Sequence, residues 1–325
     1  MKDNPYIGPR PYERQDRHNF YGRTREARDL LSLIRAKRVV LFYAQSGAGK
    51  TSLLNTQIIP ALEEDGFNVL PVARVGGDVP PGIDPSSVKN TFVFSVLMGL
   101  AGKDVPAQAL AQQTLPLFLR QLIRTTDEPL PQGVDEDATL AIGGRHRPPI
   151  LILDQFEEIL TTHRDRWRDV QGSFEQLNEA LHEMPELGVV LAMREDHVAG
   201  LDPYAPLLSK RLRTRFRMEQ LAYEGALEAV QKPAARAGCP FAPGVAERLV
   251  DALRRIRTAL PSPVAERDGM LRGAGDGGEG ILGPYVEPLP ERSYLHRRIP
   301  PWLLMPDQTP ASASRWRRSP LSAER

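Results

Sequence analysis

The chain has 325 residues, enough for one large or two medium domains, and its 41% hydrophobic and 26% charged residues are typical of a folded globular protein. Its 42 basic and 41 acidic residues leave a net charge of +1, so no overall field favours nucleic acid or an anionic membrane. Cys239 is the single cysteine, which excludes an intrachain disulfide and a multi-cysteine metal site.

The N-terminal residues predict neither export nor membrane insertion. They are polar and lack the apolar segment of a secretory signal. The most apolar stretch, Thr91–Ala101, is shorter than the ~20 residues that span a bilayer. With the single cysteine, these features predict a soluble, cytoplasmic protein with no membrane partner, and nucleic acid is not expected as a partner either.

Strand and helix signals alternate along the first two thirds of the chain. Residues 1–35 form an N-terminal lead-in that begins with prolines and ends in a helical pattern. Apolar runs that predict strands follow at 39–43, 69–75, 150–153 and 189–193, with a weaker one at 215–221. This alternation over residues 36–222 predicts an α/β fold, a three-layer sandwich with a mostly parallel sheet.

After residue 222 the strand signals stop, and a helical subdomain is predicted over residues 223–288. An amphipathic helix within it carries Val245, Leu249, Leu253 and Ile256. Glycine and proline are frequent over residues 261–280, which predicts a flexible loop. Arginine, proline and serine dominate residues 289–325, which we expect to form a disordered, solvated tail.

A phosphate-binding loop is predicted directly after the first strand. The sequence there reads Ala44-Gln45-Ser46-Gly47-Ala48-Gly49-Lys50-Thr51-Ser52. It matches the Walker A pattern GxxxxGK[ST] except at the first position, where alanine replaces glycine. In such a loop, backbone N–H groups and a helix N-terminus surround the phosphates, Lys50 contacts the β- and γ-phosphates, and the Thr51 hydroxyl binds Mg²⁺. The strand before the loop and the helix after it favour ATP or ADP binding over an ordinary glycine turn.

An acidic segment follows the apolar run 150–153 and has the form of a Walker B element. Asp154 is predicted to hold Mg²⁺ together with Thr51. Glu157 and Glu158 are the nearest candidates to orient or deprotonate the attacking water, and the sequence does not choose between them. Many P-loop ATPases place a glutamate directly after the aspartate, whereas Gln155 stands there in this chain, so we predict slow hydrolysis.

Arginines near the carboxyl ends of the later strands are candidates for sensing the γ-phosphate. Arg194 closes the strand 189–193, at the end of a parallel sheet where ligands bind. Alternatively, it is a surface arginine paired with Glu195 or Asp196. A basic run at 210–217 contains either an arginine finger or only a solvated surface.

These motifs, in this order, resemble the novel STAND NTPases of the nSTAND1 type over about residues 4–288. The similar segments are residues 7–12, residues 20–23 with Glu26, the phosphate loop, residues 154–158, residues 193–196 and residues 283–288. The resemblance implies a signal-transduction ATPase that alternates between an ADP-held closed form and an ATP-bound homo-oligomer, with unidentified sensor and effector partners. It also implies that Gly22 and Arg23 lie near the adenosine, that Arg194 is the sensor arginine, and that Pro288 contacts nucleotide from the helical subdomain.

The chain departs from the family pattern after Pro288, where residues 289–292 replace an expected apolar helix. We therefore predict a C-terminally incomplete chain, truncated or frame-shifted. The predicted function is a nucleotide-dependent molecular switch with slow ATP hydrolysis. A non-hydrolysing nucleotide-binding interaction module, or a truncated relic of such a switch, is the alternative. A mechanical AAA-type ATPase would require a clear arginine finger, a P-loop kinase would need an acceptor pocket, and no Asn-Lys-x-Asp segment indicates GTP.

Overall fold

The computed structural model describes residues 4–102, 105–126, 147–163, 165–208 and 212–259. The chain divides into two compact units, Tyr6–Gly225 and a second one of Met1–Pro5 with Ala226–Arg325. The predicted glycine-rich loop at 261–280, the predicted contact of Pro288 and the predicted tail at 289–325 lie outside the described residues.

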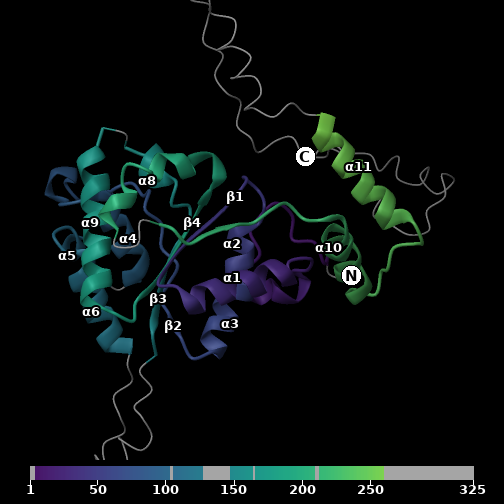
Figure 1. The fold of residues 1–325 in the computed structure, drawn as a ribbon, viewed down its shortest axis with the longest axis horizontal. Coiled ribbons are helices and arrows are strands. Elements are labelled where there is room, and N and C mark those ends of the chain that lie inside the picture. Colours follow the sequence, from purple (N-terminus) through teal and green to yellow (C-terminus); the bar gives the residue numbers. More distant parts are fainter. Residues whose placement is uncertain (1–3, 103–104, 127–146, 164, 209–211, 260–325) are drawn as a thin grey trace, which may run out of the picture. The chain divides into compact units, whose positions relative to one another are not determined.

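A parallel sheet forms the centre of the first unit (Figure 1). Its five strands among the described residues are β1 (Val39–Ala44), β2 (Asn68–Val69), β3 (Pro149–Leu153), β4 (Gly188–Arg194) and β5 (Arg215–Arg217). They are arranged in the order β2-β3-β4-β1-β5, and every neighbouring pair is parallel. The predicted parallel α/β sheet is confirmed.

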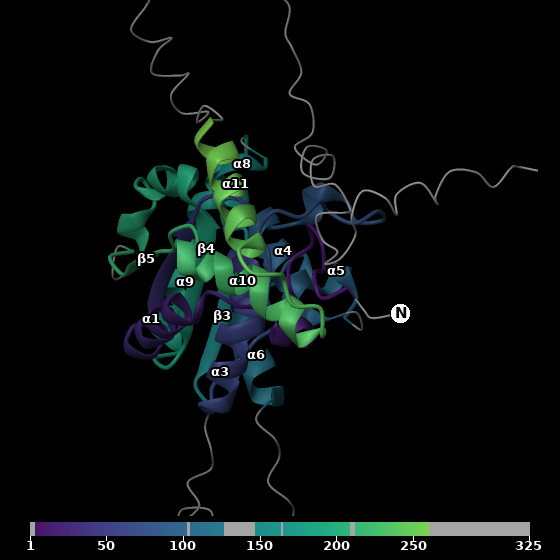
Figure 2. The same cartoon turned by 90° about the vertical axis from the view of Figure 1, so that its right-hand side faces the viewer.

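Helices cover both faces of this sheet, as Figures 1 and 2 show. Successive residues of a strand point to opposite faces, so Val39 and Leu41 belong to one core cluster while Val40 and Phe42 belong to the other. The first cluster packs against α4 (Thr91–Ala101), α5 (Ala107–Leu110), α6 (Leu115–Thr126) and α9 (Trp167–Glu183). The second packs against α1 (Thr24–Ala36) and a continuous helix formed by α2 (Lys50–Leu53), the π-helical turn η2 (Leu54–Ile58) and α3 (Ile59–Glu64). The predicted three-layer sandwich is confirmed.

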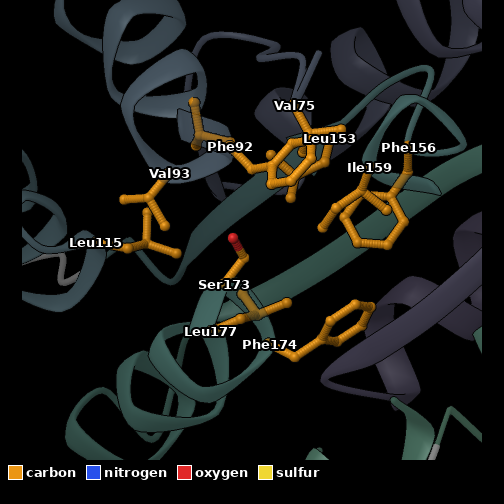
Figure 3. A pocket seen from close by; sticks show the side chains of 11 residues that line it. Val75, Phe92, Val93, Leu115, Leu153, Phe156, Ile159, Ser173, Phe174 and Leu177 are labelled. Carbon is orange, nitrogen blue, oxygen red and sulfur yellow. The ribbon is translucent and has the colours of Figure 1, made fainter. Parts of the chain in front are cut away.

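Helix α9 and its neighbours enclose a small apolar cavity. Figure 3 shows the hydroxyl of Ser173 pointing into a space bordered by side chains such as Phe92 of α4, Leu153 of β3 and Leu177 of α9. The Ser173 hydroxyl donates a hydrogen bond to the Asp169 carbonyl at 2.7 Å, so this partly buried polar group is satisfied. The lining is otherwise apolar, and the cavity therefore belongs to the core of this layer.

The predicted strand at 69–75 is wrong in its length. Strand β2 covers only Asn68–Val69, and pairing with β3 resumes at an isolated bridge between Ala73 and Leu153. Between the two, the backbone donors to β3 change from Asn68 and Leu70 to Ala73, one residue beyond the regular alternation, and Pro71 lies in this irregular stretch of the edge strand. The other edge strand, β5, is likewise shorter than the predicted run at 215–221.

Two helices at the end of the described chain are α10 (Tyr223–Arg236) and α11 (Val245–Ala259). The predicted helix at Val245 is present, but its buried face differs from the predicted one. Ala246 and Val250 are buried, whereas Leu253 is 40% exposed. Periodicity identified the helix correctly and could not say which part of its apolar surface would be covered.

The remaining described elements are short. They are η1 (Arg14–Asn19), η3 (Pro85–Ser87), α8 (Glu158–Thr161), η4 (Glu195–Leu201) and η5 (Ala205–Leu207). Helix α8 follows β3 after the segment 154–157, and the turn η4 begins directly after β4, so both border the site described below. Among all described helices, none has both the length and the apolar character required to traverse a lipid bilayer.

Candidate nucleotide site

The phosphate loop connects the end of β1 to the start of α2 (Figure 1). Gly47 and Gly49 have φ angles of +71° and +94°, in the left-handed region that residues with a Cβ rarely adopt. A Cβ placed on either glycine would meet no atom within 4 Å. The two glycines are therefore required by the backbone path, and the loop presents its main chain to open space.

Ala44 accounts for the departure from the Walker A pattern at its first position. This residue is fully buried, ends β1 and lies opposite Arg194 of β4 in the strand register. An extended strand residue has no need of glycine. Alanine is therefore compatible with the loop, and its carbonyl accepts a hydrogen bond from the Lys50 ammonium at 3.3 Å.

The side chain of Lys50 is folded back over the loop. Its Nζ also donates to the Gln45 carbonyl at 3.5 Å. Burial lowers the pKa of the Lys50 ammonium, while the nearby carboxylates of Glu157 and Asp154 act to raise it. The cation is thus partly removed from water and placed among acidic side chains at the mouth of the loop.

Thr51 and Asp154 are brought together from positions far apart in the sequence. The Thr51 hydroxyl donates to Asp154 Oδ2 at 2.7 Å, and Asp154 is only 2% exposed. Hydroxyl and carboxylate oxygens are ligands that suit Mg²⁺. No cluster of three or more His, Cys, Asp or Glu side chains suitable for a metal occurs in the described part of the chain. The pair therefore fits a cation that takes its remaining ligands from phosphates and water.

Glu157 and Glu158 diverge after the strand end. Gln155 lies between β3 and these two glutamates, and its φ of +54° turns the chain sharply. Glu157 then accepts a hydrogen bond from the Arg194 backbone N–H at 3.1 Å. Glu158 accepts one from the Gly76 backbone N–H at 3.2 Å, and burial raises the pKa of its carboxyl group. Of the two, Glu157 is the one whose charge acts on the ammonium of Lys50.

Arg194 lines the same cleft and is paired with a neighbouring acid. Its guanidinium donates to the two carboxylate oxygens of Asp196 at 2.8 and 3.2 Å. The alternative of a surface arginine pairing with Asp196 is therefore what this structure shows, and the sensor role stays a prediction. In the basic run, Arg215 pairs with Asp202 and Arg217 with Glu195 on the surface.

Neither Gly22 nor Arg23 is among the residues that line the cleft. Arg23 is only 3% exposed, and it donates to the Ala48 carbonyl at 3.1 Å and the Glu219 carbonyl at 2.7 Å. Its guanidinium also forms an ion pair with Glu26 of α1. Arg23 therefore joins α1, the phosphate loop and the segment after β5. The contact with adenosine that the resemblance implies for both residues stays a prediction.

The packing at Gly22 leads to a stability prediction. Its φ is +84°, and a Cβ there would lie 2.2 Å from the Gly225 carbonyl oxygen. We expect Gly22→Ala to lower the free energy of unfolding by at least about 2 kcal/mol, because backbone strain and a backbone clash add. Gly66→Ala is the matched control, since Gly66 has a φ of +88° with open space around it and should cost about 1 kcal/mol. Thermal denaturation measures both, and equal losses would contradict the role of the contact.

The cleft is lined by the predicted phosphate-loop and acidic residues together with others, such as Thr161 and His197, to which the sequence assigned no role. The lining residues are Pro9, Arg10, Pro11, Ser46, Gly47, Gly49, Lys50, Thr51, Ser52, Asp154, Gln155, Glu157, Glu158, Thr161, Arg194 and His197. It holds about 1320 Å³ of space, open solvent at its mouth included. The segment at 7–12 was singled out by its motif alone, and only the fold shows that part of it reaches this cleft.

These features define a P-loop NTPase. The first strand of a parallel sheet leads into a glycine-containing phosphate loop, and beside that loop a threonine is hydrogen-bonded to an aspartate at the end of another strand. The profile of the family Novel STAND NTPase 1 matches residues 5–262. The chain belongs to this family, and hence to the nucleotide-binding NTPases. No curated protein matches the sequence.

Three solved structures resemble the fold at low sequence identity. A Walker-type ATPase of Pyrococcus abyssi has 14% identity and a TM-score of 0.50, over 74% of this chain and 65% of that one. The ORC2 protein of Aeropyrum pernix, in ADPNP and ADP complexes, has 15% identity and a TM-score of 0.40, over 72% of this chain and 55% of that one. A DNA replication initiation factor has 15% identity and a TM-score of 0.41, over 77% of this chain and 60% of that one. The matched region thus spans less than two thirds of each structure, and the first supports the P-loop fold alone.

Proposed function

We propose that the cleft binds ATP or ADP with Mg²⁺ and that the chain is a nucleotide-dependent molecular switch that hydrolyses ATP slowly. The observation that carries this proposal is the hydrogen bond of 2.7 Å between Thr51 and Asp154 at the phosphate loop. This pair supports the proposal because the Thr51 hydroxyl would bind Mg²⁺ beside a β-phosphate held by the loop, and Asp154 would hold the ion through that hydroxyl and bound water. Bound Mg²⁺ would supply charge neutralisation to the phosphates.

Each residue of the loop has a role in binding. The backbone N–H groups of residues 46–52 would donate to phosphate oxygens, at the N-terminal end of the helix that starts with α2. Lys50 would exchange the carbonyl oxygens of Ala44 and Gln45 for the β- and γ-phosphates. The exchange is favoured because a phosphate is a charged acceptor and a carbonyl is neutral.

For hydrolysis, we assign the water-orienting role to Glu157. It lies beside Lys50 and is only 9% exposed, while Glu158 is directed toward the backbone of Gly76. A carboxylate near the γ-phosphate position can accept a proton or a hydrogen bond from the attacking water. Arg194, which is bonded to Glu157 through its backbone, would exchange Asp196 for the γ-phosphate and so sense it.

The switch would operate through nucleotide-dependent assembly. A ligand changes a two-state equilibrium only through its different affinity for the two states, and a shift from 1:99 to 99:1 requires about 5.5 kcal/mol. The γ-phosphate, read by Arg194 and Glu157, is the part of the ligand that distinguishes ATP from ADP. Family membership supports a signalling role with separate sensor and effector proteins, and ATP-dependent homo-oligomerisation would be its output.

We expect the purified protein to contain adenine nucleotide, to hydrolyse ATP slowly in a Mg²⁺-dependent reaction, and to form larger assemblies with ATP than with ADP. Chromatography of the extracted nucleotide, phosphate release with and without EDTA, and light scattering measure the three properties. A folded protein that carries and binds no nucleotide would contradict the whole proposal. Assemblies of equal size with ATP and ADP would contradict the switch alone.

One observation favours a second candidate, a nucleotide-binding interaction module without hydrolysis. Gln155 occupies the position directly after the Walker B aspartate and lines the cleft, where it supplies an amide and not a carboxylate. An amide cannot serve as a general base. Retained nucleotide with no phosphate release in single-turnover conditions would support this candidate over the switch with slow hydrolysis.

A further inference from the structure

The N-terminal segment 9–12 is fixed against the helix that starts at the phosphate loop. The Tyr12 backbone N–H donates to the Ser52 hydroxyl at 3.1 Å, and the Asn55 side-chain amide donates to the Tyr12 carbonyl at 3.2 Å. The Tyr12 ring also packs edge to face on Phe20, with ring centres 5.3 Å apart. Because Ser52 follows Thr51 directly, these contacts attach the segment beside the phosphate site.

The attachment places Arg10 on the wall of the nucleotide cleft. Arg10 is flanked by Pro9 and Pro11, whose rings fix the backbone angle φ, and all three residues line the cleft that contains Lys50. The Arg10 side chain is 46% exposed and donates to the two carboxylate oxygens of Asp16 at 2.7 and 3.2 Å. Asp16 is itself held in place by the Glu13 backbone N–H at 2.9 Å.

The ion pair between Arg10 and Asp16 is exchangeable. It lies at the surface, where ion pairs contribute little because water screens them and competes for them. A phosphate group offers a guanidinium several charged acceptor oxygens and the same two-pronged geometry as a carboxylate. An anionic nucleotide in the cleft would therefore compete with Asp16 for the guanidinium.

The charges around the cleft also favour this exchange. The carboxylates of Asp154, Glu157 and Glu158 line it together with the cations of Lys50, Arg10 and Arg194. These formal charges balance each other before any ligand enters. A nucleoside polyphosphate adds negative charge even with Mg²⁺ bound, so each cation that can turn toward it strengthens binding.

We propose that Arg10 exchanges Asp16 for the phosphate oxygens of a bound nucleotide, so that the N-terminal segment forms part of the nucleotide site. The inference rests on the proposed nucleotide binding and adds to it a binding residue from outside the Walker motifs. Asp16 is then the residue that holds Arg10 ready beside the cleft. A purely structural ion pair, by contrast, would serve only to attach the segment.

Two substitutions on opposite sides of the ion pair distinguish these roles. Titration of the full chain with a fluorescent ADP analogue should show about tenfold weaker binding for Arg10→Ala, the loss of one charge-assisted contact. Asp16→Asn should bind as tightly as the unchanged protein or more tightly, because it frees Arg10 while its amide oxygen can still accept from Glu13. The control is Arg14→Ala, which removes the cation at the start of η1 that pairs with Glu63 and should leave the affinity unchanged.

The result separates the two proposals. If the unchanged protein binds no nucleotide, the proposed function fails. If it binds and Arg10→Ala binds equally well, only the assignment of Arg10 is overturned. Comparable weakening by Arg10→Ala and Asp16→Asn would also overturn it, since loss of a structural ion pair affects both variants alike. Circular dichroism establishes that each variant is folded.

Discussion

Lys50→Ala should weaken nucleotide binding by at least about 100-fold, because it removes the cation that contacts both the β- and γ-phosphates. In the structure the ammonium is held only by the carbonyls of Ala44 and Gln45 among its described hydrogen bonds. When the Lys50 ammonium moves to a phosphate, it therefore exchanges neutral carbonyl acceptors for charged phosphate oxygens. Titration with the fluorescent ADP analogue measures the loss, and an unchanged affinity would contradict the assignment of the site.

The same variant should not destabilise the protein without nucleotide. Burial lowers the pKa of the Lys50 ammonium, which means that its environment disfavours the charge in the absence of a ligand. Alanine removes that cost, so the unliganded variant should unfold at the same temperature or higher. Added ADP should raise the unfolding temperature of the unchanged protein and not of the variant. Lys89→Ala, at an exposed position, is the control for general charge effects.

The sequence predicted the fold and the centre of the site because both depend on local patterns. Uninterrupted apolar runs identified β1, β3 and β4, since strands covered on both faces must be apolar throughout. The Walker A loop was identifiable because its glycines serve a local backbone path at Gly47 and Gly49. The novel STAND family was recognised from the same motifs, and the family match confirms it.

Other features depended on contacts between distant residues. The proposed assignment of the water-orienting role to Glu157 rests on the different contacts of Glu157 and Glu158 after Gln155. Gln155 adopts a left-handed conformation that residues other than glycine seldom adopt and that no pattern indicated. The position of Arg10 depends on a hydrogen bond between Tyr12 and Ser52, 40 residues away.

Glu157→Gln should reduce ATP hydrolysis by at least about 100-fold while nucleotide binding is retained. The glutamine amide oxygen can still accept the hydrogen bond from the Arg194 backbone, so the turn after β3 should keep its form. What it loses is the negative charge beside Lys50, and with it the ability to take a proton from water. Loss of this charge also reduces repulsion of phosphate, so ATP should bind at least as tightly as before.

Glu158→Gln is the matched control, because its carboxylate contacts the Gly76 backbone instead and its amide oxygen can keep that contact. Single-turnover hydrolysis with protein in excess of ATP compares the two variants even if release of product is slow. Turnover lost in Glu157→Gln and kept within a few-fold in Glu158→Gln identifies Glu157 as the residue that orients the water. The reverse pattern would transfer that role to Glu158, whose carboxyl group has a pKa raised by burial and is therefore a stronger base than an ordinary glutamate.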